Sequence, residues 1–225
     1  MSSRQTYHPL FDLMHSKPSL SSLSLHQSSQ SSVDFFADQH FLPSGSLTRL
    51  SLNLSFNLAD EIKQQFFKML PLRNPKLLKL GLPKCFIKGY RPQPPEVTFM
   101  AHLSSMQHLQ SVTIHPVKGE YAETPELSLV ETGNILDALV KKESFKSLKK
   151  FKMSIDKNPS QQTQGQYVSE DDKKTLFKKV VKVVKEGRLE ELTFFIRFIQ
   201  DKDKVSLGEM TFRSINQGSQ LMTFN

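Results

Sequence analysis

The sequence of 225 residues contains one cysteine and no tryptophan. A single thiol, Cys85, can form neither an internal disulfide nor a Cys-x-x-Cys metal or redox motif. No run of apolar residues approaches the roughly 18 that a membrane-spanning helix needs, and the N-terminus lacks the apolar core of a secretory signal. We therefore expect no membrane insertion and an intracellular location, in the cytoplasm first, with the nucleus or an organelle as alternatives.

Motifs that carry common enzyme chemistry are also missing. The chain contains no G-x-x-x-x-G-K-[ST], G-x-G-x-x-G, G-x-S-x-G or H-E-x-x-H. Its seven histidines are scattered, and His102 and His108 stand six residues apart, a spacing of neither a helical metal pair nor a zinc finger. We expect a binding module rather than an enzyme, with no catalytic residue, metal, cofactor or small-molecule substrate.

Positive charge is in excess. Thirty Lys and Arg residues face 22 Asp and Glu, a net charge of +8. Such a balance suits an acidic protein, an RNA or an anionic surface, and does not choose among them. Hydrophobic residues make up 37% of the chain at a mean hydropathy of −0.39, values that favour a thin and well-solvated body.

The most regular pattern in the chain is an apolar residue, a gap of two, and then two alternating apolar residues. It begins at positions 20, 47, 77, 109, 148 and 189, with intervals of 27, 30, 32, 39 and 41 residues. The alternating residues predict a half-buried strand, and the residue three before predicts a bend into it. Recurrence at such intervals is typical of repeat architectures.

Helical spacing of apolar residues fills the intervals. It predicts helices within 57–70, 132–145 and 169–187, and two shorter ones within 96–106 and 32–42. Asn57 is the expected N-cap of the first, Ser169 with Asp172 resembles a capping box, and Gly187 is a fitting stop. The stretches 88–97 and 156–169 are expected to be irregular loops. Residues 193–199 and 205–215 predict an antiparallel hairpin that caps the sheet.

The recurring Leu47-x-x-Leu50-x-Leu52 and Leu77-x-x-Leu80-x-Leu82 resemble leucine-rich repeat proteins, of the ribonuclease-inhibitor-like or F-box-associated type with degenerate repeats. The resemblance covers about residues 18–200 and implies an α/β solenoid of about six irregular repeats, with parallel strands on the concave face and helices on the convex face. We therefore expect an N-terminal segment at 1–19, a solenoid at 20–200 and a C-terminal cap at 201–225. The resemblance implies no catalytic residue and a tendency to bind macromolecules.

Strand alternation predicts which side chains face a partner. Residues between and just after the strand leucines point away from the core and should form three rows across the strands. These rows are Ser22, Arg49, Lys79, Ser111, Lys150 and Glu191; Ser24, Ser51, Gly81, Thr113, Lys152 and Thr193; and His26, Asn53, Pro83, His115, Ser154 and Phe195. The predicted contact residues on the concave face are Arg49, Asn53, Lys79, His115, Lys150, Lys152 and Phe195. The alternative interpretation is that they are ordinary polar residues of a solvated sheet.

A second basic feature is the helix predicted within 169–187. It is either a patch for an anionic partner or the solvated back of an amphipathic helix. Our leading hypothesis is a non-enzymatic scaffold for protein–protein interaction within a larger assembly, with an acidic protein among the candidate partners. The alternatives are an RNA-associated subunit that uses the lysine-rich C-terminal half, and a substrate-recruiting adaptor of a ubiquitin ligase. The lysines of this predicted patch are Lys173, Lys174, Lys178, Lys179, Lys182 and Lys185.

Overall fold

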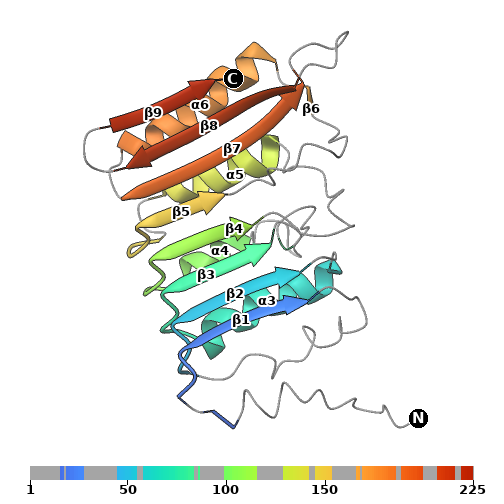
Figure 1. Cartoon of the computed structure of the whole chain (residues 1–225), viewed down its shortest axis with the longest axis vertical. Helices are drawn as coiled ribbons and strands as arrows, with labels where there is room; N and C mark the ends of the chain where they lie inside the picture. Colours follow the sequence, from blue (N-terminus) through green and yellow to red (C-terminus); the bar gives the residue numbers. More distant parts are fainter. Residues whose placement is uncertain are drawn as a thin grey trace.

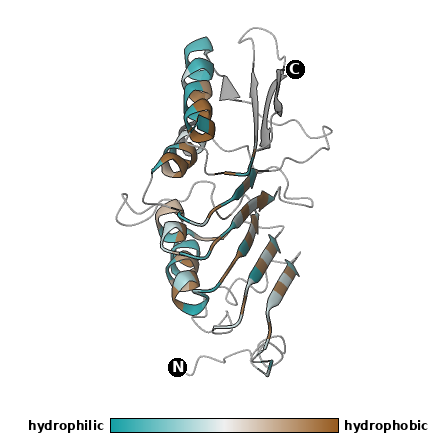
Figure 2. Cartoon of the chain, turned by 90° about the vertical axis from the view of Figure 1, so that its left-hand side faces the viewer, coloured by the Kyte–Doolittle hydropathy of each residue, from teal (hydrophilic) through white to brown (hydrophobic). Residues whose placement is uncertain are grey.

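The described part of the protein is an α/β structure with a single open sheet and four helices on one side of it (Figures 1 and 2). The computed structural model describes residues 16–17, 19–27, 45–54, 58–83, 86, 99–115, 129–141, 145–153, 166–167, 169–185, 189–199, 207–215 and 219–224. For residues 27, 54, 129–131, 166–167, 194–199, 207–215 and 219–224, only the backbone is described.

Six parallel strands follow one another across the sheet in chain order, and two antiparallel strands extend it. The order is β1-β2-β3-β4-β5-β7-β8-β9, and β6 pairs with β7 off this path. Sequential neighbours pair because a helix-bearing crossover returns the chain beside the strand it has just left. The strands are β1 (Ser22–Gln27), β2 (Arg49–Leu54), β3 (Lys79–Pro83), β4 (Ser111–His115), β5 (Lys150–Met153), β6 (Gln166–Tyr167), β7 (Glu191–Ile199), β8 (Leu207–Ile215) and β9 (Ser219–Phe224).

The helices occupy the crossovers between β2 and β7. Figure 2 shows them as one layer beside the sheet, with the brown apolar stripes of the strands alternating with teal polar ones. The helix-covered side of the sheet is therefore the core side, and we call the other side the open face. The helices are α3 (Asp60–Arg73), α4 (Phe99–Ser104), α5 (Leu129–Val140) and α6 (Glu170–Lys185).

The predicted register is confirmed. The residues in line across β1 to β5 and β7 are Leu23, Leu50, Leu80, Val112, Phe151 and Leu192. All six side chains are 9% exposed or less and point into the core beneath the helices. Because the side-chain period of a strand is two, a slip by one residue would turn this whole row outward. The apolar pattern therefore fixes the register.

The bend before each strand is held by the same backbone bonds in every unit. The carbonyl of Ser21 accepts hydrogen bonds from the N–H groups of both Thr48 and Arg49, and the carbonyl of Thr48 accepts from Leu78 and Lys79. The arrangement recurs at three further junctions. The carbonyls of Leu78, Gln110 and Lys149 accept from residue pairs 110 and 111, 149 and 150, and 190 and 191.

In four of the six units the first leucine closes a turn before the strand. Leu77 donates its N–H to the carbonyl three residues earlier, at Asn74, and Leu20, Leu109 and Leu148 make the same bond. Leu47, Leu77, Leu109 and Leu148 are 0–2% exposed. The turn thus lies just before the first leucine, and the gap of two in the sequence pattern is the pair of residues whose N–H groups share one carbonyl.

Four phenylalanines join α3 to α4. Phe66 and Phe67 of α3 contact Phe86 in edge-to-face geometry at ring-centroid distances of 5.0 and 6.1 Å. Phe67 also lies 5.7 Å from Phe99 of α4. Each ring is 5% exposed or less, so the cluster forms a continuous apolar joint between two neighbouring units.

The start of α6 agrees with the cap predicted from the sequence, and the start of α3 differs from it. The Oγ of Ser169 accepts the N–H of Asp172, and the Asp172 carboxylate accepts the N–H of Ser169, so the capping box of α6 is confirmed. The N-cap prediction for the first helix is wrong. The cap of α3 is Ala59, which makes no side-chain hydrogen bond, and Asp60 and Glu61 in the first turn place negative charge there instead.

The C-terminal part contains more strand than expected. β7 and β8 form the predicted antiparallel pair, and β9 adds a third strand that the sequence did not indicate. Residues 166 and 167, expected to be loop, form β6 and pair in parallel with the end of β7. Cys85, Asn57, Gly187 and the short helix predicted at 32–42 lie outside the described residues.

Candidate protein interface on the open face

The open face presents polar side chains in rows that run across the strands. The paired residues of the first row are Ser22, Arg49, Lys79, Ser111, Lys150 and Glu191. The second row, two residues further along each strand, contains Ser24, Ser51, Gly81, Thr113, Lys152 and Thr193. Both rows agree with the sequence prediction, because strand alternation turns every second residue away from the helices.

Two cations stand side by side in the first row. Arg49 on β2 pairs directly with Lys79 on β3, and both side chains are exposed. No described carboxylate lies within ion-pair distance of either one. In the registers of the described strands, this is the one pair of like charges in direct opposition.

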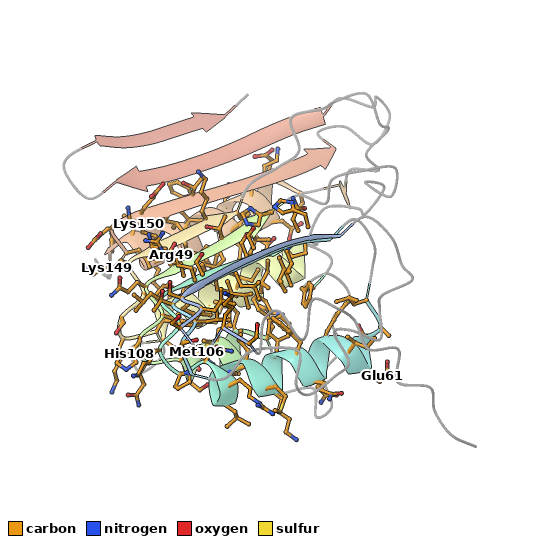
Figure 3. The ribbon with its side chains drawn as sticks, turned by 60° about the horizontal axis from the view of Figure 1, so that its bottom comes forward. Arg49, Glu61, Met106, His108, Lys149 and Lys150 are labelled. Carbon is orange, nitrogen blue, oxygen red and sulfur yellow. The ribbon has the colours of Figure 1, made fainter. Side chains whose placement is uncertain are left out.

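Lys150, the next cation of the first row, and Lys149, which precedes it in the chain, both have acidic partners. Lys150 forms an ion pair with Glu191 on the adjacent strand at 3.7 Å, and Lys149 forms one with Glu190 at 2.9 Å. Figure 3 shows Arg49, Lys149 and Lys150 at the end of the sheet where the parallel strands begin. The sequence prediction named Lys150 as an anchor and placed Glu191 next to it in the same row, because both stand at the same offset from the first leucine of their units. The ion pair between them was not predicted.

The second row has a bare position at its centre. The Nε2 of His115 and the Oγ of Ser51 lie so close over Gly81 that a Cβ built there would be 2.6 and 3.0 Å from them. His115, a predicted contact residue, is therefore half-buried and lies back across the neighbouring strand. Lys152, in the same row, is exposed and has no described ion-pair partner.

The third predicted row is only partly formed. Asn53 lies beside His26, with its Nδ2 3.3 Å from the ring Nδ1, and Pro83 pairs with His115. The described pairing of β2 with β3 ends at Ser51, so Asn53 has no partner on β3. Pro83 was expected to face outward and is buried. The backbone of Phe195 pairs with β8, and its side chain lies outside the described residues.

The six lysines of α6 do not form one patch. Leu176, Val180 and Val183 make the buried stripe of the helix. Two lysines lie beside this stripe and are engaged in ion pairs: Lys173 with Glu170, and Lys179 with Asp137 of α5 at 2.6 Å. The hydrogen bond from Lys173 also lowers the pKa of Glu170. Lys173 and Lys179 thus carry counter-charges that the sequence did not indicate, and the six-lysine patch for an anionic partner stays a prediction.

The outer side of α6 carries the other four lysines. Lys174 pairs with Asp171 at 3.5 Å, in an exposed pair. Lys178, Lys182 and Lys185 are exposed, and no carboxylate of the described residues pairs with them. Because α6 covers the core side of the sheet, these lysines and those of the open face lie on opposite sides of the molecule (Figure 2). The basic C-terminal half is two separate surfaces.

A metal centre and a membrane span were also considered for the described part of the chain. No group of three His, Cys, Asp or Glu side chains in it could hold a metal ion. His102 on α4 has an Nε2 that is buried without a hydrogen-bond partner, and burial, aided by Lys68, lowers its pKa. None of the described helices is long and apolar enough to cross a membrane.

Comparisons of the chain with protein-family models, with curated proteins and with solved structures found no match. The resemblance to leucine-rich repeats thus depends on the residue spacing within this sequence.

Proposed function

We propose that the protein is a non-enzymatic interaction scaffold, built as a solenoid of the leucine-rich-repeat kind, that binds a protein partner through the open face of its sheet. The observation that carries the proposal is the alignment of exposed cations and hydroxyl groups in rows across successive parallel strands. Three of these cations, Arg49, Lys79 and Lys152, have no counter-charge among the described residues. A complementary acidic surface would steer association and fix the register of the partner.

The repeat character of the proposal has its own support. Five successive junctions use the same two-donor hydrogen bond to one carbonyl, although the intervals between the units differ in length. Units stacked in this manner contact their nearest neighbours and build an extended surface, which repeat proteins commonly use for binding. Such an analogy predicts binding and gives no identity for the partner.

The test compares two variants with equal changes of charge. Arg49→Glu with Lys152→Glu alters the open face, and Lys178→Glu with Lys182→Glu alters the outer side of α6. The purified wild-type and variant proteins capture partners from a nuclease-treated extract, and the bound proteins are quantified by mass spectrometry. We expect the open-face variant to lose a defined set of partners and the α6 variant to keep it, with neither variant melting below the wild type. The opposite result would place the interface on α6 and refute the proposal.

RNA binding is the second candidate, because Lys178, Lys182 and Lys185 share one exposed side of α6. Three phosphate contacts would make the logarithm of the binding constant fall with the logarithm of salt concentration at a slope of about −2. Fluorescence anisotropy with a labelled single-stranded RNA measures that slope. If the Lys178→Glu and Lys182→Glu variant binds as tightly as the wild type, this candidate fails.

A further inference from the structure

The placement of Arg49 beside Lys79 is unfavourable for the fold alone. Neighbouring strands in a sheet lie about 4.8 Å apart, so two cations in direct lateral register repel each other. Both side chains belong to central strands and are held there by the register that the buried leucines impose. A like-charge pair that stability does not require suggests that its charge serves another molecule.

The same row contains the arrangement that stability favours. Two strands further along, Lys150 has Glu191 as its direct neighbour at 3.7 Å. Each pair joins equivalent positions of two neighbouring units, and both pairs lie on the same face and in the same row. In this row Lys150 thus has an acid beside it, whereas Arg49 has a second cation beside it. The Lys150 and Glu191 pair is therefore an internal reference for the Arg49 and Lys79 pair.

Hydrogen-bonding groups adjoin the two cations. One row away, about 6.5–7 Å along the strands, lie Ser51 Oγ and His115 Nε2 above the bare backbone of Gly81. Within the first row, Ser22 and Ser111 flank the two cations on either side. The centre of the open face therefore offers two positive charges, without a counter-charge among the described residues, next to hydroxyl and imidazole groups.

We propose that Arg49 and Lys79 form the principal contact point for an acidic segment of the partner protein, in which carboxylate groups meet the two cations and a polar group meets Ser51 and His115. This inference rests on the proposed function and deepens it by naming the chemistry of the partner and its place on the sheet. An arginine offers a fork of donors to a carboxylate and a lysine offers a compact charge, so two carboxylates, or one bridging carboxylate, satisfy both side chains. Lys150 contributes less because Glu191 already neutralises it.

The decisive variant is Lys79→Glu, because stability and binding should change in opposite directions. It places an acid beside Arg49 and so copies the Lys150 and Glu191 pair. We expect the melting temperature to rise by about 2–4 °C. Affinity for an acidic ligand should fall at least tenfold, since an attractive charge becomes a repulsive one. A residue with a purely structural role would not separate these two effects.

The probe is a fluorescein-labelled synthetic peptide of alternating glutamate and serine, with an otherwise identical peptide of glutamine and serine as its control. Fluorescence anisotropy at low and physiological salt measures its affinity for the full chain. Glu191→Lys is the matched control variant: it creates a second like-charge pair, so it should lower the melting temperature while the peptide binds as well or better. Lys79→Gln removes one charge without adding another and should give an intermediate affinity.

The outcomes distinguish this inference from the proposed function. Opposite shifts of stability and affinity in Lys79→Glu support the inference. Equal binding of the glutamate and glutamine peptides, or unchanged glutamate-peptide affinity in Lys79→Glu, overturns it. The inference is also overturned if the protein binds a phosphoserine peptide or an RNA oligonucleotide but not the glutamate peptide. If Lys79→Glu retains the captured native partners while Arg49→Glu with Lys152→Glu loses them, the inference fails and the scaffold function stands. If both variants retain them, the scaffold proposal fails as well.

Discussion

Replacement of Phe67 by alanine tests whether the aromatic cluster joins two units of the fold. Phe67 has no exposed surface and contacts Phe66, Phe86 and Phe99 at ring-centroid distances of 5.4, 6.1 and 5.7 Å. A buried Phe→Ala change costs about 3–5 kcal/mol, and aromatic pairs add about 0.5–1.5 kcal/mol each beyond their buried area. Because three pairs are lost together, we expect a value near the upper end, about 4–5 kcal/mol.

Urea denaturation followed by far-ultraviolet circular dichroism is the assay, since the chain has no tryptophan to report unfolding. At a slope of about 3 kcal/mol per molar, the midpoint should fall by about 1.5 M. The matched control is Phe177→Ala on α6, where the ring is 38% exposed and the change should cost less than about 1.5 kcal/mol. Equal losses in the two variants would refute the idea that this cluster holds α3 to α4.

Three further changes have definite expected results. Ser169→Ala removes the cap of α6 and should lower the unfolding free energy by about 1 kcal/mol, measured by urea denaturation, whereas the exposed Thr175→Ala should not. Gly81→Ala should change stability by less than about 1 kcal/mol, because only side-chain tips obstruct the new methyl group. In the His115→Ala variant, which lacks the nearest obstruction, the same change should be stabilising. A double-mutant cycle that shows no coupling contradicts this contact. The lowered pKa of His102 means that the unfolded chain binds a proton more readily than the folded chain. The contribution of His102 to stability should therefore be full above about pH 6.5 and fall as the pH drops below it. His102→Gln should weaken the dependence of melting temperature on pH, and an unchanged dependence assigns the effect to other groups.

Much of the sheet could be predicted from the sequence, because one physical rule controls it. A leucine facing water exposes a large apolar surface, so the spacing of Leu50, Leu52, Leu80 and Leu82 fixes both the strands and their register. Polar rows follow from the same alternation. Capping of α6 was also predictable, since Ser169 and its partner stand within one turn and need no distant contact.

Other features depend on contacts that one local stretch does not contain. β6 consists of two residues in a polar stretch and exists because the far end of β7 offers it a partner. The start of α3 is a different case, because Asp60 and Glu61 of its own first turn, and no side-chain cap, complement the helix dipole there. The inward lean of His115 depends on the missing side chain of Gly81 on another strand. Pairing of Lys179 with Asp137 joins residues 42 positions apart, so the lysine pattern of α6 alone could not indicate this counter-charge.

The carbonyl that accepts two N–H groups at each junction allows the crossovers to change in length. The distance between neighbouring strands is set by these bonds, while equivalent positions of neighbouring units stand 27 to 41 residues apart in the chain. Spatial pitch and chain length are therefore independent in this protein. Residues added within a crossover lengthen the excursion of the chain without moving the rows of the open face, so the spacing of a binding surface can persist while the segments that connect it diverge.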